Sequence, residues 1–417
     1  MGEQGPDLRA LTRVFARIGV LSFGGPAAQI ALMHRELVAG RGWLSERQFL
    51  DALSFCMLLP GPEAMQLATY AGWRLHGVRG GLIAGGLFVI PGAGLILALA
   101  AMYAALGDVP LVQALFLGIQ AAVVAIVAQA MMRLAGRALE GAAHWALAGL
   151  AFVGLFVFNL PFPLIIVLAA LYGLATGGGT AETAPDAAPA RTLPTVAFWS
   201  ALWLVPLAAL WLVEGGLLAQ IGIFFAQLAV VSFGGAYAVL AWMTQTVVQE
   251  HGWLTTAQMI DALGLAETTP GPLILVTEFV AFLAGAQAGG PWLGVAAALV
   301  ALWATFLPCF LWIFAGAPYI AWIGTRPRLS AALRAVTAAV VGVMLNLALW
   351  FAAHVMFARV ETLEAGPVRM ILPDPSSLVP QAAILALAAG LLLIWRGWSL
   401  PLVLGLAALA GALLGAV

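Results

Sequence analysis

Residues 22–62 read SFGGPAAQIALMHRELVAGRGWLSERQFLDALSFCMLLPGP, and residues 232–272, 210 positions later, read SFGGAYAVLAWMTQTVVQEHGWLTTAQMIDALGLAETTPGP. Four motifs keep this spacing without a gap: Ser-Phe-Gly-Gly, Gly-Trp-Leu, Asp-Ala-Leu and Pro-Gly-Pro. Between Phe15 and Pro62, 21 of 48 aligned positions are identical in the second copy. Shared hydrophobicity alone does not produce such agreement, so we interpret the chain as an internal duplication.

The composition is that of a membrane protein. Of the 417 residues, 63% are hydrophobic and 8% are charged, and the mean hydropathy is +1.04. Apolar runs of about 20 residues predict helical spans rather than the strands of a barrel. A net charge of −1 does not fit a nucleic-acid-binding protein. The five histidines and two cysteines lack metal-ligand spacing, so we expect neither metal nor cofactor.

The predicted fold is an all-α polytopic membrane protein with two repeats of about six spans each. The first repeat covers residues 1–176, a linker and one linking span cover 177–216, and the second repeat covers 217–417. The similarity continues past the opening motifs, because Pro91 matches Pro308 at an offset of 217. The total is about 13 spans.

An odd linking span would turn the second copy over in the membrane, and the arginines support this. All 17 basic residues are arginine, and cytoplasmic loops carry an excess of positive charge. Arginines begin the first copy and the fourth span of the second copy, where the other copy is uncharged: Arg9, Arg13 and Arg17, and Arg326, Arg328 and Arg334. We therefore expect inverted-topology repeats with a cytoplasmic N-terminus. The exception is the loop at Gly42, where Arg41 and Arg47 would face outward.

Both copies break their helices within the membrane. The segment 8–38 would reach about 45 Å as one helix, longer than a hydrocarbon core of about 30 Å. Gly-Gly and Pro-Gly-Pro are helix breakers, and inverted repeats with broken helices are typical of secondary transporters. A broken helix exposes backbone N–H groups and a partial positive charge, which suit an anion. The alternative is that these residues merely kink packed spans.

The candidate substrate-binding residues lie at and beside the breaks. Their hydroxyl and amide groups can donate to an oxyanion, or they can bond to their own helix. The set is Ser22, Gly24, Gly25, Pro60, Gly61, Pro62, Gln66, Ser232, Gly234, Gly235, Thr268, Thr269, Pro270, Gly271 and Pro272.

Four charged residues near the breaks are further candidates, because charge within a membrane is expensive and is by default functional. Glu63, Glu267 and Glu278 are proton-coupling candidates, although Glu63 also suits the first turn of a helix. Arg74 is either an anion contact or an interfacial anchor beside Arg79.

The paired SFGG, GWL, DAL and PGP motifs, with LLPGPEAMQLATYAGW at 58–73 and TTPGP at 268–272, resemble the long, two-domain members of the chromate ion transporter family. The resemblance covers nearly the whole chain. The second copy departs from the family pattern in carrying Glu267 and Glu278 where neutral residues are expected.

The resemblance implies a multi-pass carrier in the inner membrane of a bacterium or archaeon. It would export chromate, driven by the proton-motive force, and give chromate resistance, with sulfate as a structural mimic. Its partners would be the oxyanion and membrane lipid, and a homodimer is left open. The alternatives are a carrier for sulfate or an organic acid, a passive anion channel and, least favoured, an intramembrane enzyme.

Overall fold

The structure is a computed structural model that describes residues 6–23, 25–107, 109–178, 192–213, 215–233, 236–320, 326–366 and 368–415. Three of the predicted site residues, Gly24, Gly234 and Gly235, lie outside these ranges, as does most of the predicted linker.

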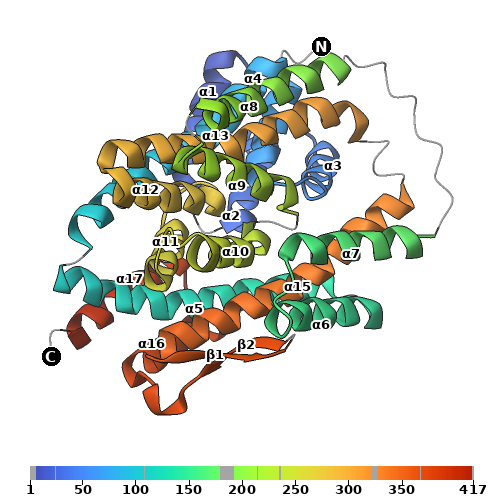
Figure 1. Ribbon diagram of the computed structural model, residues 1–417. Coiled ribbons are helices and arrows are strands. Elements are labelled where there is room, and N and C mark those ends of the chain that lie inside the picture. Colours follow the sequence, from blue (N-terminus) through green and yellow to red (C-terminus); the bar gives the residue numbers. More distant parts are fainter. Residues whose placement is uncertain are drawn as a thin grey trace. The chain divides into compact units, whose positions relative to one another are not determined.

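Helices make up nearly all of the described chain (Figure 1). The first copy and the linking span comprise α1 (Leu8–Leu21), α2 (Gly25–His34), the π-helical η1 (Arg35–Ala39), α3 (Glu46–Cys56), α4 (Glu63–Leu106), α5 (Pro110–Ala138), α6 (Ala142–Phe156), α7 (Phe162–Thr176) and α8 (Thr192–Val213).

The second copy begins with the same succession of elements and then departs from it. It comprises α9 (Leu217–Val231), α10 (Ala236–Thr244), η2 (Gln245–Glu250), α11 (Thr256–Thr268), η3 (Leu273–Leu275), α12 (Val276–Gly289), α13 (Pro291–Gly316), η4 (Ala317–Tyr319), α15 (Pro327–Met356), strands β1 (Val360–Ala365) and β2 (Val368–Pro373), η5 (Pro375–Ser377), α16 (Pro380–Gly390), η6 (Leu391–Trp395) and α17 (Leu400–Gly415).

The predicted class, an all-α polytopic membrane protein, is confirmed, with one addition. Five helices of the described chain are long and apolar enough to cross a membrane: α4, α5, α8, α13 with η4, and α15. The other apolar helices are shorter, so the predicted total of about 13 spans stays a prediction. The addition is the antiparallel hairpin of β1 and β2, which the sequence analysis did not predict.

In both copies a capping box begins the helix that follows Gly-Trp-Leu. Ser45 accepts a hydrogen bond from the N–H of Gln48, whose side chain accepts one from the N–H of Ser45. Thr255 and Gln258 form the same reciprocal pair before α11. These capping boxes satisfy backbone donors that a helix start leaves unpaired.

Each copy also bends after the helix that follows Pro-Gly-Pro. α4 is two helices merged across a kink, because His76 and Gly77 have non-helical angles and Gly77 has φ of 59°. In the second copy, Gly290 with φ of 87° separates α12 from α13. In both copies a glycine with positive φ thus separates the helix that follows Pro-Gly-Pro from the next helix.

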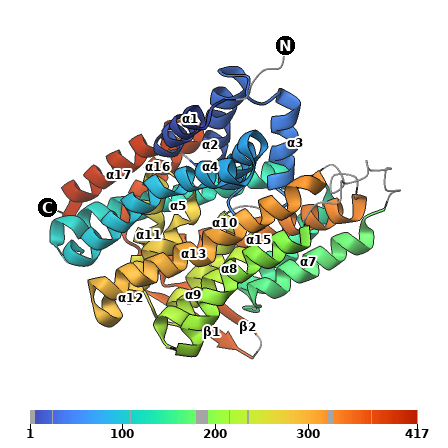
Figure 2. The same ribbon diagram turned by 90° about the horizontal axis from the view of Figure 1, so that it is seen from above.

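The described chain forms two compact units that do not follow the repeat boundaries. The first unit holds residues 1–101, 179–236 and 269–327, and the second holds 102–178, 237–268 and 328–417. Each unit thus contains segments of both copies. Within the first unit α8, α9 and α13 pack together, and within the second α5 packs against α16 and α17 (Figure 2).

Small residues allow the close packing of α5 on α17. A Cβ atom added at Gly118 would lie 1.8 Å from the carbonyl oxygen of Ala407, and one at Gly411 would lie 2.5 Å from that of Ala114. Small residues four positions apart, Ala114 with Gly118 and Ala407 with Gly411, thus let the two backbones touch.

The close approach predicts that Gly118→Ala lowers the thermal stability of the protein, by on the order of 1–3 kcal/mol. Gly405→Ala, on α17, is the matched control, because no atom lies within 4 Å of the added Cβ. Helical circular dichroism followed on heating in detergent measures both. Equal midpoints for the two variants would contradict the packing described above.

Candidate functional site

The helix breaks pair crosswise between the two copies, within the first unit. The N–H of Gly61, in the first Pro-Gly-Pro, donates to the carbonyl oxygen of Ser232 at 3.0 Å. The N–H of Gly271, in the second Pro-Gly-Pro, donates to the carbonyl oxygen of Ser22 at 3.0 Å. Each Pro-Gly-Pro break is therefore joined to the Ser-Phe-Gly-Gly break of the other copy, and we call these two contacts the crossed bonds.

Glycine is needed at the centre of both Pro-Gly-Pro motifs. Gly61 has φ of 121° and Gly271 has φ of 92°, a region that other residues rarely adopt. Space is short as well, since a Cβ at Gly61 would lie 2.7 Å from Nε2 of Gln66. The crossed bonds thus depend on a backbone conformation that only glycine adopts without strain.

The proline-containing helices pack on the same breaks with the same symmetry. Gly92, beside Pro91, lies so close to Pro270 that an added Cβ would be 2.2 Å from its carbonyl oxygen. Cys309, beside Pro308, lies 3.1 Å from the Cβ position of Gly61. Because Gly92 and Cys309 are at matching positions of the two copies, the packing repeats the pattern of the crossed bonds.

Both serines end a helix in the same way. Ser22 has φ and ψ of −81° and 59°, and Ser232 has −79° and 52°. The hydroxyl of Ser22 donates to the carbonyl oxygen of Gly19 at 2.8 Å, and that of Ser232 donates to Ala229 at 2.9 Å. The hydroxyl of Thr268 donates to Leu265 at 2.7 Å. In this conformation the three hydroxyls donate to their own helices, and that of Ser22 also accepts from the N–H of Gly271 at 3.1 Å.

One polar residue at this site escaped the sequence analysis. Gln29, 1% exposed, donates from Nε2 to the carbonyl oxygens of Gly271 at 2.7 Å and Ser22 at 3.1 Å. It therefore ties the two partners of one crossed bond together. The signal in the sequence is a glutamine within an apolar helix, four residues after Gly25, where the second copy has Val239.

Gln66 plays a similar part in the first copy alone. Its Nε2 donates to the carbonyl oxygen of Pro60 at 2.6 Å, whereas the second copy has Val276 at the matching position. The Oε1 atoms of Gln29 and Gln66 are buried without a hydrogen-bond partner among the described residues. Two amide groups with unused polar atoms therefore lie at the breaks, and both come from the first copy.

An ion pair shows that the first break reverses the chain. Arg17, on α1, lies 3.7 Å from Glu36, on η1, and Arg41 also pairs with Glu36. One straight helix would separate residues 17 and 36 by about 28 Å. The chain therefore folds back between α1 and α2, so that Arg17 and Arg41 both lie beside Glu36.

The predicted charged residues have different surroundings. Glu63 is half-buried in the first turn of α4, and Glu267 is buried near the end of α11. Glu278, in the first turn of α12, is 1% exposed, and its Oε2 has no hydrogen-bond partner among the described residues. Arg74 is exposed, two residues before the kink at His76.

Thr269 and the proline-glycine residues that follow it are buried in the first unit, whereas Glu267 and Thr268 belong to the second. Within the described residues no group of three or more histidine, cysteine, aspartate or glutamate side chains is arranged to hold a metal ion.

Comparison with known proteins gives one consistent result. The family model described as "Chromate transporter" matches residues 9–174 and 219–412, one region in each copy. The "Chromate transport protein" of Cupriavidus metallidurans is 29% identical over 408 residues, 97% of this chain and 92% of that protein. The "Chromate transport protein" of Pseudomonas aeruginosa is 34% identical over 344 residues, 79% of this chain and 77% of that protein.

A shorter relative matches only part of the chain. The "Uncharacterized transporter YwrB" of Bacillus subtilis is 30% identical over 173 residues, which are 40% of this chain but 85% of that protein. A relative of about the length of one copy agrees with the internal duplication. No solved structure matches this one.

The hydrogen bonds of Gln29 predict that Gln29→Val, which reproduces the residue of the second copy, lowers stability by about 1–3 kcal/mol, since two buried carbonyl oxygens lose a donor. Gln113→Val, at an exposed position of α5, is the control and should be close to the parent. Thermal melting in detergent compares the two. A Gln29→Val protein as stable as the control would show that this amide does not hold the breaks.

Proposed function

Because this chain belongs to the chromate transporter family, we propose that it is a secondary carrier that exports chromate from the cytoplasm and so gives chromate resistance. Family membership places it among membrane transporters rather than enzymes. The observation that carries the proposal is the pair of crossed bonds, which brings the four predicted breaks together in one unit. We propose that the chromate dianion binds there.

The donors at this site are used inside the protein in the conformation described above. The N–H groups of Gly61 and Gly271 point at the carbonyl oxygens of Ser232 and Ser22. We propose that the crossed bonds open in another conformation, in which the anion accepts hydrogen bonds from these N–H groups. Exchange of a carbonyl oxygen for an oxyanion keeps each N–H group hydrogen-bonded, so the opening need not leave a buried donor unpaired.

Carriers built from inverted repeats alternate access by moving one part of the protein against another. Since each compact unit contains segments of both copies, we propose that the units are the moving bodies. Two of the places where the chain passes between the units, residues 236–237 and 268–269, lie beside the two breaks of the second copy. Glycine-rich and proline-flanked breaks suit a hinge, because a few residues there absorb the change in backbone angles.

The membrane potential suits the proposed direction. Moving one elementary charge through 100 mV is worth about 2.3 kcal/mol, so a dianion gains roughly twice that on leaving a cell whose interior is negative. The proton-motive force includes this potential. Export from the cytoplasm across a bacterial or archaeal inner membrane, with the N-terminus in the cytoplasm, is consistent with the basic residues at the start of α1 and in the adjoining Gly42 loop.

Glu278 is the carboxyl group that we propose for proton coupling. A second buried acid, Asp261, accepts from Tyr103 and Gln120 at 2.7 Å each, one donor per oxygen, as expected of a structural group. Glu63 and Glu267 also have interactions within the protein. Glu278 instead leaves one buried oxygen without a partner, which is expensive while the group is charged. A carboxyl group that gains and loses a proton as the site alternates is what coupling requires.

The proposed transport is tested in inverted membrane vesicles that contain the protein. Energised vesicles should accumulate labelled chromate with saturable kinetics, and a protonophore should abolish the accumulation. Vesicles without the protein are the control. Flux that does not saturate and ignores the gradient would indicate a channel, and accumulation of sulfate but not chromate would indicate a different carrier; either result contradicts the proposal.

The proposed role of Glu278 predicts that the Glu278→Gln variant still transports chromate. Its rate should lose the pH dependence of the parent rate, because glutamine is neutral at every pH. Glu361→Gln, at an exposed position of the hairpin, is the control and should keep the parent profile. Initial rates of chromate uptake across a series of pH values measure both. A parent-like profile for Glu278→Gln would exclude Glu278 as the coupling group.

A further inference from the structure

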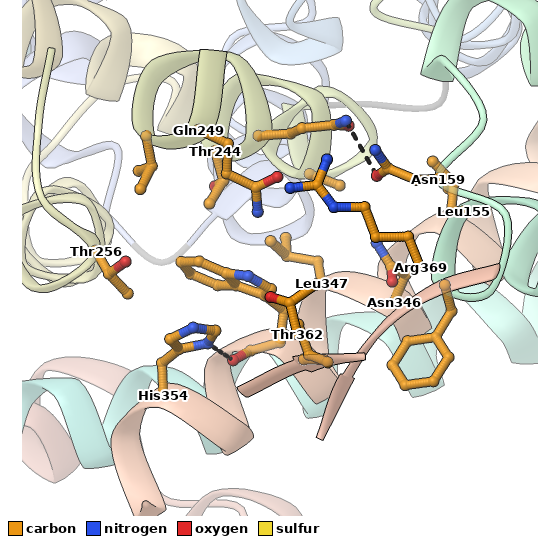
Figure 3. Close-up of a pocket in the computed structure, with 16 residues that line it drawn as sticks. Leu155, Asn159, Thr244, Gln249, Thr256, Asn346, Leu347, His354, Thr362 and Arg369 are labelled. Carbon is orange, nitrogen blue, oxygen red and sulfur yellow. Dashed lines mark hydrogen bonds between the residues drawn. The ribbon is translucent and has the colours of Figure 1, made fainter. Parts of the chain in front are cut away.

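A polar cavity in the second unit takes no part in the site proposed above. Its volume is about 250 Å³, and residues of four regions of this unit line it, none of them from the breaks (Figure 3). It is lined by Leu155, Phe156, Asn159, Ala241, Thr244, Gln245, Val248, Gln249, Thr256, Asn346, Leu347, Trp350, His354, Thr362, Arg369 and Ile371. Pockets for drug-sized ligands are commonly larger, from about 300 Å³ upward, so a small ligand fits best.

The charge of the lining favours an anion. Arg369 brings a guanidinium group, which points toward Gln249 and Asn159 in Figure 3. Among the described residues that line the cavity none is acidic. Glu364 lies opposite Arg369 in the hairpin register, and its side chain is outside the described part of the chain. A metal cation would meet the arginine without a carboxylate ligand, whereas the planar guanidinium fork matches an oxyanion.

The position of the arginine is built into the fold. The N–H of Arg369 donates to the carbonyl oxygen of Val157 at 2.8 Å, which fixes β2 against the end of α6. Beside it, Nε2 of Gln245 donates to Oδ1 of Asn159 at 3.2 Å, which joins η2 to the same loop. The hairpin, the α6–α7 loop and η2 therefore hold the polar groups of the cavity in place.

A second observation points to a ligand. Thr244 is 3% exposed, lines the cavity, and its hydroxyl has no hydrogen-bond partner among the described residues. A buried hydroxyl without a partner is costly, and a bound ligand oxygen would satisfy it. Asn346 adds an amide to the same lining.

From these contacts we infer that the cavity beneath the β1–β2 hairpin is a binding site for a small oxyanion, held by Arg369, Thr244 and the surrounding amides. It is separate from the site at the breaks, because its lining contains none of the residues that form the crossed bonds. The inference goes beyond the proposed function and does not depend on it. A protein that fails to carry chromate would still bind an anion here.

A local reporter tests the site without interference from the breaks. Thr362 lines the cavity at an exposed position, and the native cysteines, Cys56 and Cys309, are buried. Thr362→Cys in the full-length protein, purified in detergent, is labelled with an environment-sensitive fluorophore and titrated with sodium sulfate. The fluorescence should change saturably, and sodium gluconate at equal ionic strength should not reproduce the change.

Two variants on this background decide the outcome. Arg369→Gln should weaken sulfate binding at least tenfold, and Thr244→Val should weaken it by a smaller factor. Arg359→Gln is the matched control on the hairpin, since Arg359 pairs with Asp374 at 3.1 Å and does not line the cavity. Its binding should equal the parent. The absence of a saturable response, or equal binding by Arg369→Gln and Arg359→Gln, would overturn the inference.

Discussion

The fold around the proposed site depends on two backbone hydrogen bonds, from Gly61 to Ser232 and from Gly271 to Ser22. A chain that is 63% hydrophobic offers few side chains to satisfy a broken helix, and lipid offers none. Each break exposes backbone groups that must find a partner inside the protein. The duplication supplies these partners, because the N–H group at the Pro-Gly-Pro break of each copy donates to a carbonyl oxygen of the other copy. Neither copy could close its breaks in this way alone.

Local chemistry made much of the fold predictable. Capping pairs such as Ser45 with Gln48 act over a few residues, and so do the breaks at Gly-Gly and Pro-Gly-Pro, so a single sequence reveals them. The duplication shows each break twice in the same sequence. The hairpin lacks this support. Residues 360–373 occur in one copy only, and their strand pairing does not follow from the pattern of apolar spans.

The site was predictable in its parts but not in its connections. Sequence spacing identifies Gly61 and Gly271 as breakers, yet cannot say that each binds the other copy's serine. Gln29 was missed because its partners lie at Ser22 and Gly271, and the second partner is 242 residues away. The hydroxyls of Ser22 and Ser232 were ambiguous for a physical reason, since a serine at a helix end can satisfy a carbonyl oxygen of its own last turn.

Both copies have the helix breaks, but only the first copy has amide side chains that bind them. Amide side chains of the first copy, Gln29 and Gln66, bind backbone carbonyl oxygens at the breaks, and the second copy has Val239 and Val276 at the matching positions. Two crossings between the units lie beside the breaks of the second copy, whereas the breaks of the first copy lie wholly within the first unit. The anchoring amides thus occur at the breaks that lie within one unit, and the valines occur at the breaks that have a crossing beside them. A hinge needs freedom to change its backbone angles, so the loss of these amides from the second copy is consistent with hinges at its breaks.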